Sequence, residues 1–282
     1  MPDAVEFRGG QREQWNSAAT GWRKWSEQID KAASGVSERL VELAEVGPGS
    51  RVLDVAAGYG EPSLTAARKA GAEGSVVATD ISAQMIAFGR ERAVAAGLEN
   101  IEFVESDAAS LRFPEASFDA ALSRWGIIFE PDGQAAADRI RGFLEPGGRM
   151  AISSWGPPER VPFLTIPMRT AMQRLQVPPP PPGTPGPLSR PTPEALGGLL
   201  EEGGFSDVEV EEADVAFEWE SPEEFTTWVK EIAPPIIAMI DPHPREVQDE
   251  TWAAITEAVR EAAGNRGGVR FSNLALLAAG RA

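Results

Sequence analysis

Between residues 51 and 155, short apolar runs alternate with amphipathic segments, and this alternation constrains the fold more than any other feature of the chain. The apolar runs predict buried strands at 51–58, 75–82, 101–108, 117–125 and 149–155. The segments between them, such as 61–71 and 83–97, have helical periodicity and end at glycine. Strands that alternate with helices in this way build a parallel sheet with helices on both faces.

The chain changes character after Trp155. An irregular stretch and a helix precede a Pro-rich loop at 178–193, whose five consecutive prolines favour extended polyproline geometry. A helix with a glycine stop is expected at 193–205. Near-alternation of apolar and polar residues predicts a long strand at 206–220, and 269–282 predicts another, with helical segments between the two.

The N-terminal segment at 13–46 predicts a helix, because Trp15, Trp22, Trp25 and Ile29 recur at helical spacing. We therefore predict an α/β fold with a sheet of about seven strands and a helical cap. Its parts are expected to form one integrated domain. They are an N-terminal helical cap at 1–46, an α/β core at 47–157, a Pro-rich insertion and helix at 158–205, and closing strands at 206–282 with a helical cap segment at 221–263.

Composition excludes several classes of function. The 282-residue chain carries 43 acidic and 26 basic residues, and its formal charge of −17 disfavours binding to nucleic acid or to an anionic membrane. It has no cysteine and one histidine, so disulfides, thiolate metal sites and multi-histidine metal centres are excluded, and we expect no metal. The N-terminus has no apolar signal core, and no run of about 18 apolar residues predicts a membrane span. These features predict a cytoplasmic protein, and they leave its oligomeric state open.

Polar and small residues gather where the predicted strands end. After the first strand, Asp54 leads into a turn with Gly58 and Gly60, which let the backbone approach a ligand closely. Asp80 ends the second strand and Asp107 the third. Ligands of open parallel sheets bind beyond the carboxyl ends of the strands, so these positions predict one site. A carboxylate at Asp80 suits the two hydroxyls of a ribose, and one at Asp107 suits the exocyclic amine of an adenine.

Each of these signals also has an ordinary structural interpretation. A G-x-G sequence often only forms a tight turn, and an Asp after a strand is often a helix N-cap. Three polar strand ends in succession, each after a buried run, favour a nucleoside-shaped ligand instead. The dinucleotide fingerprint needs a third glycine where this chain has Ser63, and Glu61 would repel a pyrophosphate. A ligand without phosphate, such as S-adenosylmethionine, fits better.

The segments VLDVAAGYGEPSL, VVATDISAQMI, VESDAASLRFPEASFDAALSRWGIIF and LEPGGRMAISSW carry a family resemblance. They resemble the successive motifs of class I S-adenosylmethionine-dependent methyltransferases, in particular the small-molecule group similar to the ubiquinone/menaquinone biosynthesis enzymes. The resemblance implies a Rossmann-like, mostly parallel sheet whose last strand, at 269–282, is antiparallel. It also implies S-adenosylmethionine as cofactor and S-adenosylhomocysteine as product, with 47–157 as the cofactor-binding core. One departure is Ala56, where the family usually has glycine.

The resemblance implies a role for each strand end. Asp54 would hold the methionine ammonium of the cofactor, directly or through water, and Ser123 would offer that ammonium its carbonyl. Met85 would cover one edge of the adenine, or alternatively belong to the core. The other implied contacts are Ala56, Gly58 and Gly60 along the methionine and ribose, Asp80 at the ribose hydroxyls, Ile81 on the adenine, and Asp107 with the Ala108 N–H at the adenine amine.

The acceptor is expected between the strand ends and the cap. Its candidate walls are aromatic, and core packing is the alternative for each of them: Trp22, Trp25, Trp125, Phe129 and Trp155. Arg124 would either hold an anionic acceptor or form a structural ion pair. Together these residues favour a medium-sized, partly apolar small molecule over a nucleic acid or a protein, and they leave open which atom is methylated.

Methyl transfer from a sulfonium is an in-line displacement, in which a protein chiefly aligns the reactants and excludes water. A general base is therefore optional. The candidates are His243 in a Pro-rich turn, Tyr59, which would alternatively shield the cofactor, and Glu61. Two other classes of function stay open: a nicotinamide-dependent oxidoreductase, which Ser63 disfavours, and a non-catalytic nucleoside-binding module.

Overall fold

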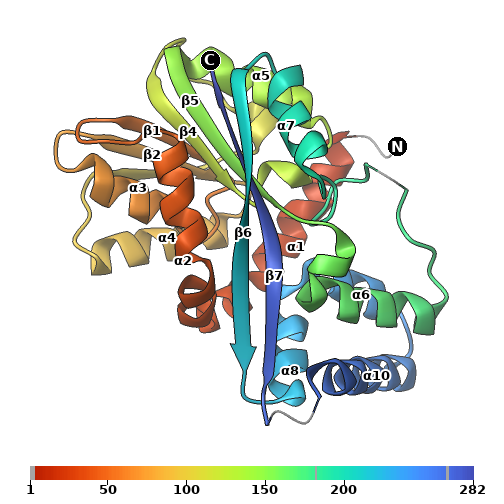
Figure 1. The fold of residues 1–282 in the computed structure, drawn as a ribbon. Helices are drawn as coiled ribbons and strands as arrows, with labels where there is room; N and C mark the ends of the chain where they lie inside the picture. Colours follow the sequence, from red (N-terminus) through yellow and green to blue (C-terminus); the bar gives the residue numbers. More distant parts are fainter. Residues whose placement is uncertain (1–3, 182, 265–266) are drawn as a thin grey trace.

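One seven-stranded sheet organises the chain (Figure 1). The computed structural model describes residues 4–181, 183–264 and 267–282. The strands lie in the order β3-β2-β1-β4-β5-β7-β6. Their bounds are β1 (Arg51–Val55), β2 (Ser75–Asp80), β3 (Ile101–Glu105), β4 (Phe118–Arg124), β5 (Leu144–Trp155), β6 (Ser206–Trp219) and β7 (Val269–Arg281). Strands β1 to β5 pair in parallel, whereas β7 runs antiparallel to both β5 and β6. The predicted Rossmann-like sheet with an antiparallel last strand is confirmed.

The strand order reverses between β1 and β4. From β1 the chain moves outward to β2 and β3, and then returns to place β4 on the other side of β1, with Val52 opposite Ala120. At such a switch point the following connections diverge, and they leave a crevice beyond the carboxyl ends of the strands. The topology thus fixes where a ligand site is expected.

Both faces of the sheet are buried under helices. Helices α2 (Ser26–Leu43), α3 (Ser63–Ala70) and α4 (Ala83–Ala95) pack on one face, and α5 (Gly133–Phe143) and α7 (Pro193–Glu202) pack on the other. Successive strand residues point to opposite faces, so Val52 joins the first core and Leu53 the second. A strand buried on both faces reads as a continuous apolar run, which is the pattern that the sequence shows.

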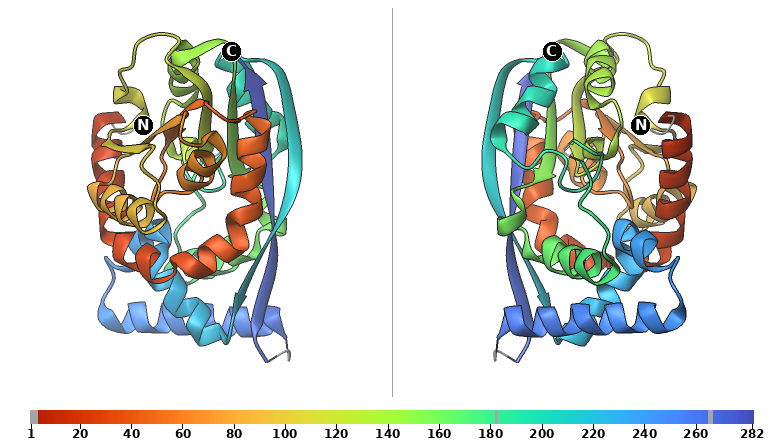
Figure 2. Two further views of the ribbon diagram at one scale, coloured as in Figure 1. Left: turned by 90° about the vertical axis from the view of Figure 1, so that its left-hand side faces the viewer. Right: turned by 90° about the vertical axis from the view of Figure 1, so that its right-hand side faces the viewer.

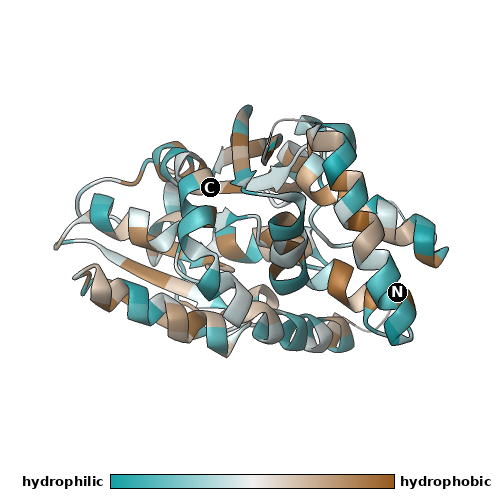
Figure 3. Cartoon of the chain, turned by 90° about the horizontal axis from the view of Figure 1, so that it is seen from below, coloured by the Kyte–Doolittle hydropathy of each residue, from teal (hydrophilic) through white to brown (hydrophobic). Residues whose placement is uncertain are grey.

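A helical cap lies beyond the carboxyl ends of the strands. It comprises α1 (Ala4–Lys24), α6 (Pro162–Leu175), α8 (Pro222–Ile232), α9 (Pro234–Ile240) and α10 (Arg245–Ala263). Strands β6 and β7 run past the rest of the sheet towards α8 and α10 (Figures 1 and 2). Hydrophilic and hydrophobic residues interleave along these helices, as expected for helices with one buried face (Figure 3).

Three short 3-10 helices complete the secondary structure of the described residues, at Ala108–Ser110, Ile127–Phe129 and Pro158–Arg160. The Pro-rich loop joins α6 to α7, and its described residues form neither helix nor strand. None of the helices in the described ranges is long and apolar enough to cross a membrane.

The N-terminal helix differs from the prediction of one helix over 13–46. It starts earlier, at Ala4, and it is broken at Trp25, so α1 and α2 are separate helices. The break has a packing reason: α1 lies against α4, α8 and α9, whereas α2 lies against β4, β5, β6 and β7. One straight helix cannot follow both surfaces.

Candidate cofactor and acceptor site

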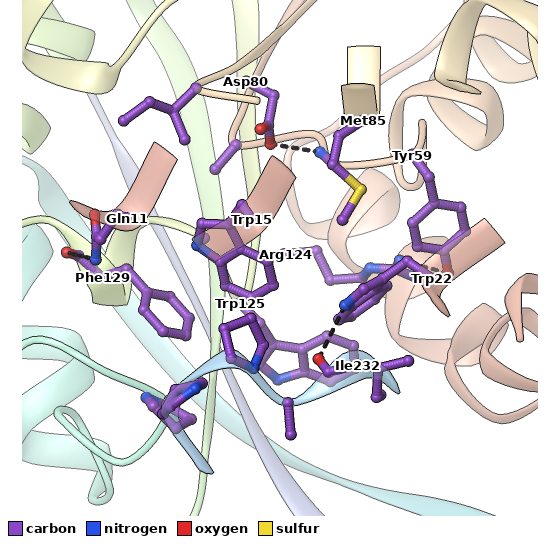
Figure 4. A pocket seen from close by; sticks show the side chains of 18 of the residues that line it. Gln11, Trp15, Trp22, Tyr59, Asp80, Met85, Arg124, Trp125, Phe129 and Ile232 are labelled. Atoms are coloured by element: carbon purple, nitrogen blue, oxygen red, sulfur yellow. Dashed lines mark hydrogen bonds between the residues drawn. The ribbon is translucent and has the colours of Figure 1, made fainter. Parts of the chain in front are cut away.

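A cavity of about 220 Å³ lies between the carboxyl ends of β1 to β5 and the cap (Figure 4). Its lining begins with strand-end residues such as Gly58, Asp80, Asp107 and Arg124. It continues without interruption into side chains of α1, α6, α8 and α9. One space therefore connects the strand ends, where a nucleoside is expected, with an aromatic chamber under the cap.

The loop after β1 has the left-handed backbone that a close approach to a ligand requires. The φ angles are +59° at Ala56, +56° at Gly58 and +109° at Gly60. Ala56 and Gly58 line the cavity. A positive φ explains the family's usual glycine at position 56, because a Cβ is disfavoured there by about 1 kcal/mol. Gly126 leaves room for the alanine, since a Cβ at Gly126 would lie only 2.4 Å from that of Ala56.

Asp80 holds this loop against the end of β2. Its Oδ2 accepts a hydrogen bond from the Gly58 N–H at 2.8 Å, and its Oδ1 accepts one from the Ser82 N–H at 2.8 Å. The carboxylate is buried but lines the cavity, and burial raises its pKa to about 6. Each carboxylate oxygen has a second lone pair, so Asp80 can still accept two ligand hydroxyls.

Asp54 lies deeper, with no exposed surface, and it is not among the residues that line the cavity. Its Oδ2 accepts a hydrogen bond from the Ser63 hydroxyl at 2.5 Å, while its Oδ1 is buried without a partner among the described residues. Burial raises the pKa of this carboxyl to about 7. A buried carboxylate oxygen that lacks a donor is destabilising unless a ligand or water supplies one. Ser63, which breaks the dinucleotide fingerprint, therefore acts here as the partner of Asp54.

The third strand end brings Asp107 and Ala108 to the cavity, with Ile81 and Met85 beside them. The Asp107 carboxylate caps the 3-10 helix by accepting from the N–H and the hydroxyl of Ser110, at 3.0 and 2.8 Å. The N-cap interpretation of Asp107 is thus confirmed, and each of its oxygens keeps a second lone pair.

Ser123 and Gly60 contribute to the site from behind its lining. The Ser123 hydroxyl donates to the Val55 carbonyl at 2.8 Å and accepts from the Ile127 N–H at 2.9 Å, which ties the ends of β1 and β4 together. Gly60 accepts the N–H of Leu64 and so begins α3. Neither is among the residues that line the cavity.

The acceptor end is predominantly aromatic. Trp125 and Trp155 stack face to face, with centroids 4.3 Å apart and an interplanar angle of 8°. Trp125 has a left-handed backbone, with φ of +53°, at the end of β4. Strain of this kind in a bulky residue is often found at functional sites. Phe129 and Trp22 also line the cavity, and the Trp22 indole donates to the Ile232 carbonyl at 3.0 Å, which joins α1 to α8.

Two candidate bases, Tyr59 and Glu61, reach the cavity with their polar groups already engaged. The Tyr59 hydroxyl donates to Asp30 at 2.8 Å, and burial raises the pKa of the phenol above its ordinary value. Glu61 accepts from the Thr65 hydroxyl at 2.7 Å and lies 3.8 Å from Arg68. A neutral phenol that already donates its proton to Asp30 is poorly placed to act as a base.

The structure corrects the placement of two predicted site residues. Trp25 lies outside the cavity, where its indole donates to Glu231 at 2.5 Å and its ring contacts Lys24. The contacts with Glu231 and Lys24 hold this ring outside the cavity that Trp22 lines. His243 lies in the turn between α9 and α10, where its carbonyl accepts from Gln248. It is not among the residues that line the cavity.

Sequence reasoning missed most of the cap's contribution. Trp15 and Gln11 of α1 line the cavity, and Gln11 donates to the Phe129 carbonyl at 3.0 Å. Arg8 pairs with Glu130 at 2.9 Å and lies 3.8 Å from Asp107, so α1 covers the end of the cavity that contains Asp107. The signal for Trp15 was present, because it shares the helical spacing of Trp22. The lining residues of α8 and α9 have no comparable signal, since only the tertiary fold brings them here.

The comparisons with known proteins agree with this geometry. Residues 52–148 match a family described as methyltransferase domain. An aklanonic acid methyltransferase of Streptomyces sp. (strain C5) is 39% identical over 119 residues, which are 42% of this chain and 54% of that protein. A ubiquinone/menaquinone biosynthesis C-methyltransferase of Teredinibacter turnerae is 37% identical over 120 residues, 42% of this chain and 48% of that protein. The chain thus spans about half the length of these relatives.

The fold also resembles a solved structure along most of its length. The YcgJ protein of Bacillus subtilis matches with a TM-score of 0.58 and 19% identity, over 88% of this chain and 98% of that one. At this identity the likeness concerns the fold alone. The match to the methyltransferase domain covers the loop after β1 and the carboxyl ends of β1 to β4, where the lining of the cavity begins.

Proposed function

We propose that the chain transfers a methyl group from S-adenosylmethionine to a small, partly apolar organic acceptor. The observation that carries the proposal is the continuity of one cavity from Asp80 and Asp107 to the stacked pair of Trp125 and Trp155. The names of the two relatives, which concern small-molecule methylation, support the same class of acceptor.

The residues at the strand ends fit the cofactor. The unpartnered Asp54 Oδ1 would receive a donor from the methionine ammonium, directly or through water, near the carbonyl of Ser123. Asp80 would accept hydrogen bonds from the ribose hydroxyls. Asp107 would accept one from the adenine amine, with the Ala108 N–H nearby. Ala56, Gly58 and Gly60 would supply the backbone that turns along the methionine and ribose, with Ile81 and Met85 against the adenine.

The bound cofactor supplies an electrophilic methyl group on a sulfonium. The chain's contribution is to align the acceptor with that group and to keep water away. Under the cap, Trp22, Trp125, Trp155 and Phe129 wall the cavity. Because Tyr59 and Glu61 are engaged elsewhere, proximity and orientation would be the main catalytic contributions.

Calorimetric titration with S-adenosylmethionine, S-adenosylhomocysteine and NAD tests the proposal. We expect both sulfur nucleosides to bind, NAD not to bind, and Asp80→Ala to abolish binding. Failure of the folded protein to bind either sulfur nucleoside would contradict the proposal, and binding of NAD would favour an oxidoreductase. Binding without turnover on any acceptor would favour a nucleoside-binding module.

A further inference from the structure

We propose that the acceptor is an aromatic acid, bound as an oxyanion by Arg124, with its ring system in the aromatic chamber beside Trp125 and Trp155. This inference rests on the proposed function and adds the substrate class to it. It predicts that carboxylates, phenolates or enolates bind, and that neutral and cationic analogues of the same shape bind poorly.

The charges that line the cavity are the first observation. Its carboxylates all have partners: Glu61 with Thr65, Asp80 with two backbone amides, Asp107 with Ser110 and Glu130 with Arg8. Within the described part of the chain, Arg124 is the one cation that lines the cavity, and no carboxylate oxygen lies within 4.0 Å of it.

Arg124 makes no direct ion pair with a described carboxylate. The residue is 8% exposed, so it has lost most of its hydration. Its Nη1 donates to the Ser37 hydroxyl at 2.8 Å and its Nη2 to the Tyr59 hydroxyl at 3.4 Å, and both of these partners are neutral. The guanidinium also lies 5.4 Å from the Trp125 ring centroid (Figure 4). Asp30, Glu61 and Asp54 act on it at longer range, and the carboxylates among its neighbours hold its pKa above the ordinary value although burial lowers it.

Buried charges are normally paired, because an unpaired one is strongly destabilising. The Arg124 Nε donates no hydrogen bond to any described residue. The Arg124 Nε is therefore a donor without a partner on a residue that lines the cavity, and a ligand that supplies an acceptor oxygen would complement it.

The lack of a proton acceptor among the described residues of the acceptor end points the same way. Trp155, Phe163, Leu164, Met168 and Phe217, which line the acceptor end, carry no group that takes up a proton. An acceptor that arrives ionised needs no base. Its anionic oxygen attacks the methyl carbon, a C–O bond forms as the S–C bond breaks, and the electron pair of that bond goes to sulfur. One negative and one positive charge are neutralised together.

The test measures binding alone, so it does not require the true acceptor. 2-Naphthoate, 2-naphthamide and 2-naphthylmethylamine have similar shapes and are anionic, neutral and cationic. We expect the wild-type protein, saturated with S-adenosylhomocysteine, to bind the naphthoate about tenfold to a hundredfold more tightly than the amide by calorimetry. The amine should bind least well.

Arg124→Met should remove the preference for the acid and leave the affinity for S-adenosylhomocysteine unchanged, and Arg124→Lys should retain part of the preference. Arg149→Met is the matched control, because it removes another largely buried guanidinium (13% exposed) from the far end of β5. It should keep the full preference. If Arg124→Met does not fold, the pKa of 4-nitrophenol bound to the wild-type protein is measured instead, from the visible absorbance of the phenolate. Binding beside Arg124 should lower the pKa of this phenol by about one unit or more.

Three results would overturn the inference. Equal affinity of the wild-type complex for naphthoate and naphthamide would show that the cavity does not recognise an oxyanion. A loss of S-adenosylhomocysteine binding in Arg124→Met, with the acid preference intact, would assign Arg124 to the cofactor. An unchanged pKa of bound 4-nitrophenol would also contradict it. Failure of the wild-type protein to bind S-adenosylhomocysteine at all would instead refute the proposed function.

Discussion

Asp80 gives the sharpest prediction about the cofactor, because its carboxylate titrates within an accessible pH range. Burial raises the pKa of Asp80 from 3.8 to about 6 in the ligand-free protein. A ribose hydroxyl donates to the ionised carboxylate, so the cofactor should bind this form preferentially. Affinity should therefore rise with pH through about 6 and reach a plateau above it.

The size of the effect follows from the ionised fraction. With a pKa of about 6, roughly one molecule in eleven carries an ionised Asp80 at pH 5, compared with nearly all at pH 8. If only the ionised form accepts both hydroxyls, the affinity for S-adenosylhomocysteine falls about tenfold between pH 8 and pH 5 through Asp80 alone. Other groups, Asp54 among them, also titrate in this range, so the wild-type curve by itself does not isolate Asp80.

The assay therefore compares wild type with Asp80→Asn by calorimetry at several pH values. The amide does not titrate and can accept from only one of the Gly58 and Ser82 N–H groups, so the variant should bind more weakly at pH 8. The ratio of the two affinities should shrink about tenfold from pH 8 to pH 5. A ratio that is constant with pH would refute the assignment of the ribose hydroxyls to this carboxylate.

Three further predictions follow from single contacts. Gly126→Ala should lower the free energy of unfolding by about 1–3 kcal/mol, because its Cβ would lie 2.4 Å from that of Ala56; thermal unfolding checks this, and an unchanged melting temperature would contradict it. Arg8→Ala should release S-adenosylhomocysteine severalfold faster in stopped-flow experiments, since Arg8 links α1 to Glu130 and Asp107, whereas Arg23→Ala, which removes an exposed pair with Glu91, should not. His243→Ala should leave turnover unchanged, because this side chain does not line the cavity; a slower methyl transfer would restore it as a candidate base.

The strand ends were predictable because the information is local. Asp54, Asp80 and Asp107 each follow or end an apolar run, and a parallel sheet brings such ends together whatever the rest of the chain does. The sequence also showed that alanine stands at position 56, where the family usually has glycine. It did not show that Gly126 leaves room for the Ala56 side chain, because the two residues follow different strands.

The cap was less predictable because its geometry depends on tertiary packing. Helical spacing groups Trp22 with Trp25, but the break at Trp25 comes from two helices that pack on different surfaces, and no residue there signals it. The segments of α8 and α9 were predicted as helices, yet which of their residues face the cavity depends on how α1 lies against them. His243 was a candidate base only because an imidazole can accept a proton. It lies in a turn, where no sequence periodicity indicates which way a side chain points.

The buried carboxyl groups of the site should also make the ligand-free protein less stable as the pH rises. The pKa rises from 3.8 to about 6 for Asp80 and to about 7 for Asp54, so the folded state binds more protons than the unfolded state between these values. At about 1.4 kcal/mol for each pKa unit, burial of the ionised forms costs about 3 and about 4 kcal/mol at pH 8. Both are large against a typical stability of about 5–15 kcal/mol.

Urea unfolding of the ligand-free protein should therefore give a higher free energy of unfolding at pH 5.5 than at pH 8. The carboxyls whose pKa is lowered, which are Asp119, Glu45 and Glu223, titrate below this window, so they do not reverse the sign within it. Saturating S-adenosylhomocysteine should flatten or invert the profile, because its donors compensate the ionised carboxylates and its affinity grows with pH. A higher free energy of unfolding at pH 8 than at pH 5.5 in the ligand-free protein would contradict the prediction. It would show that burial of ionised Asp54 and Asp80 does not destabilise the fold.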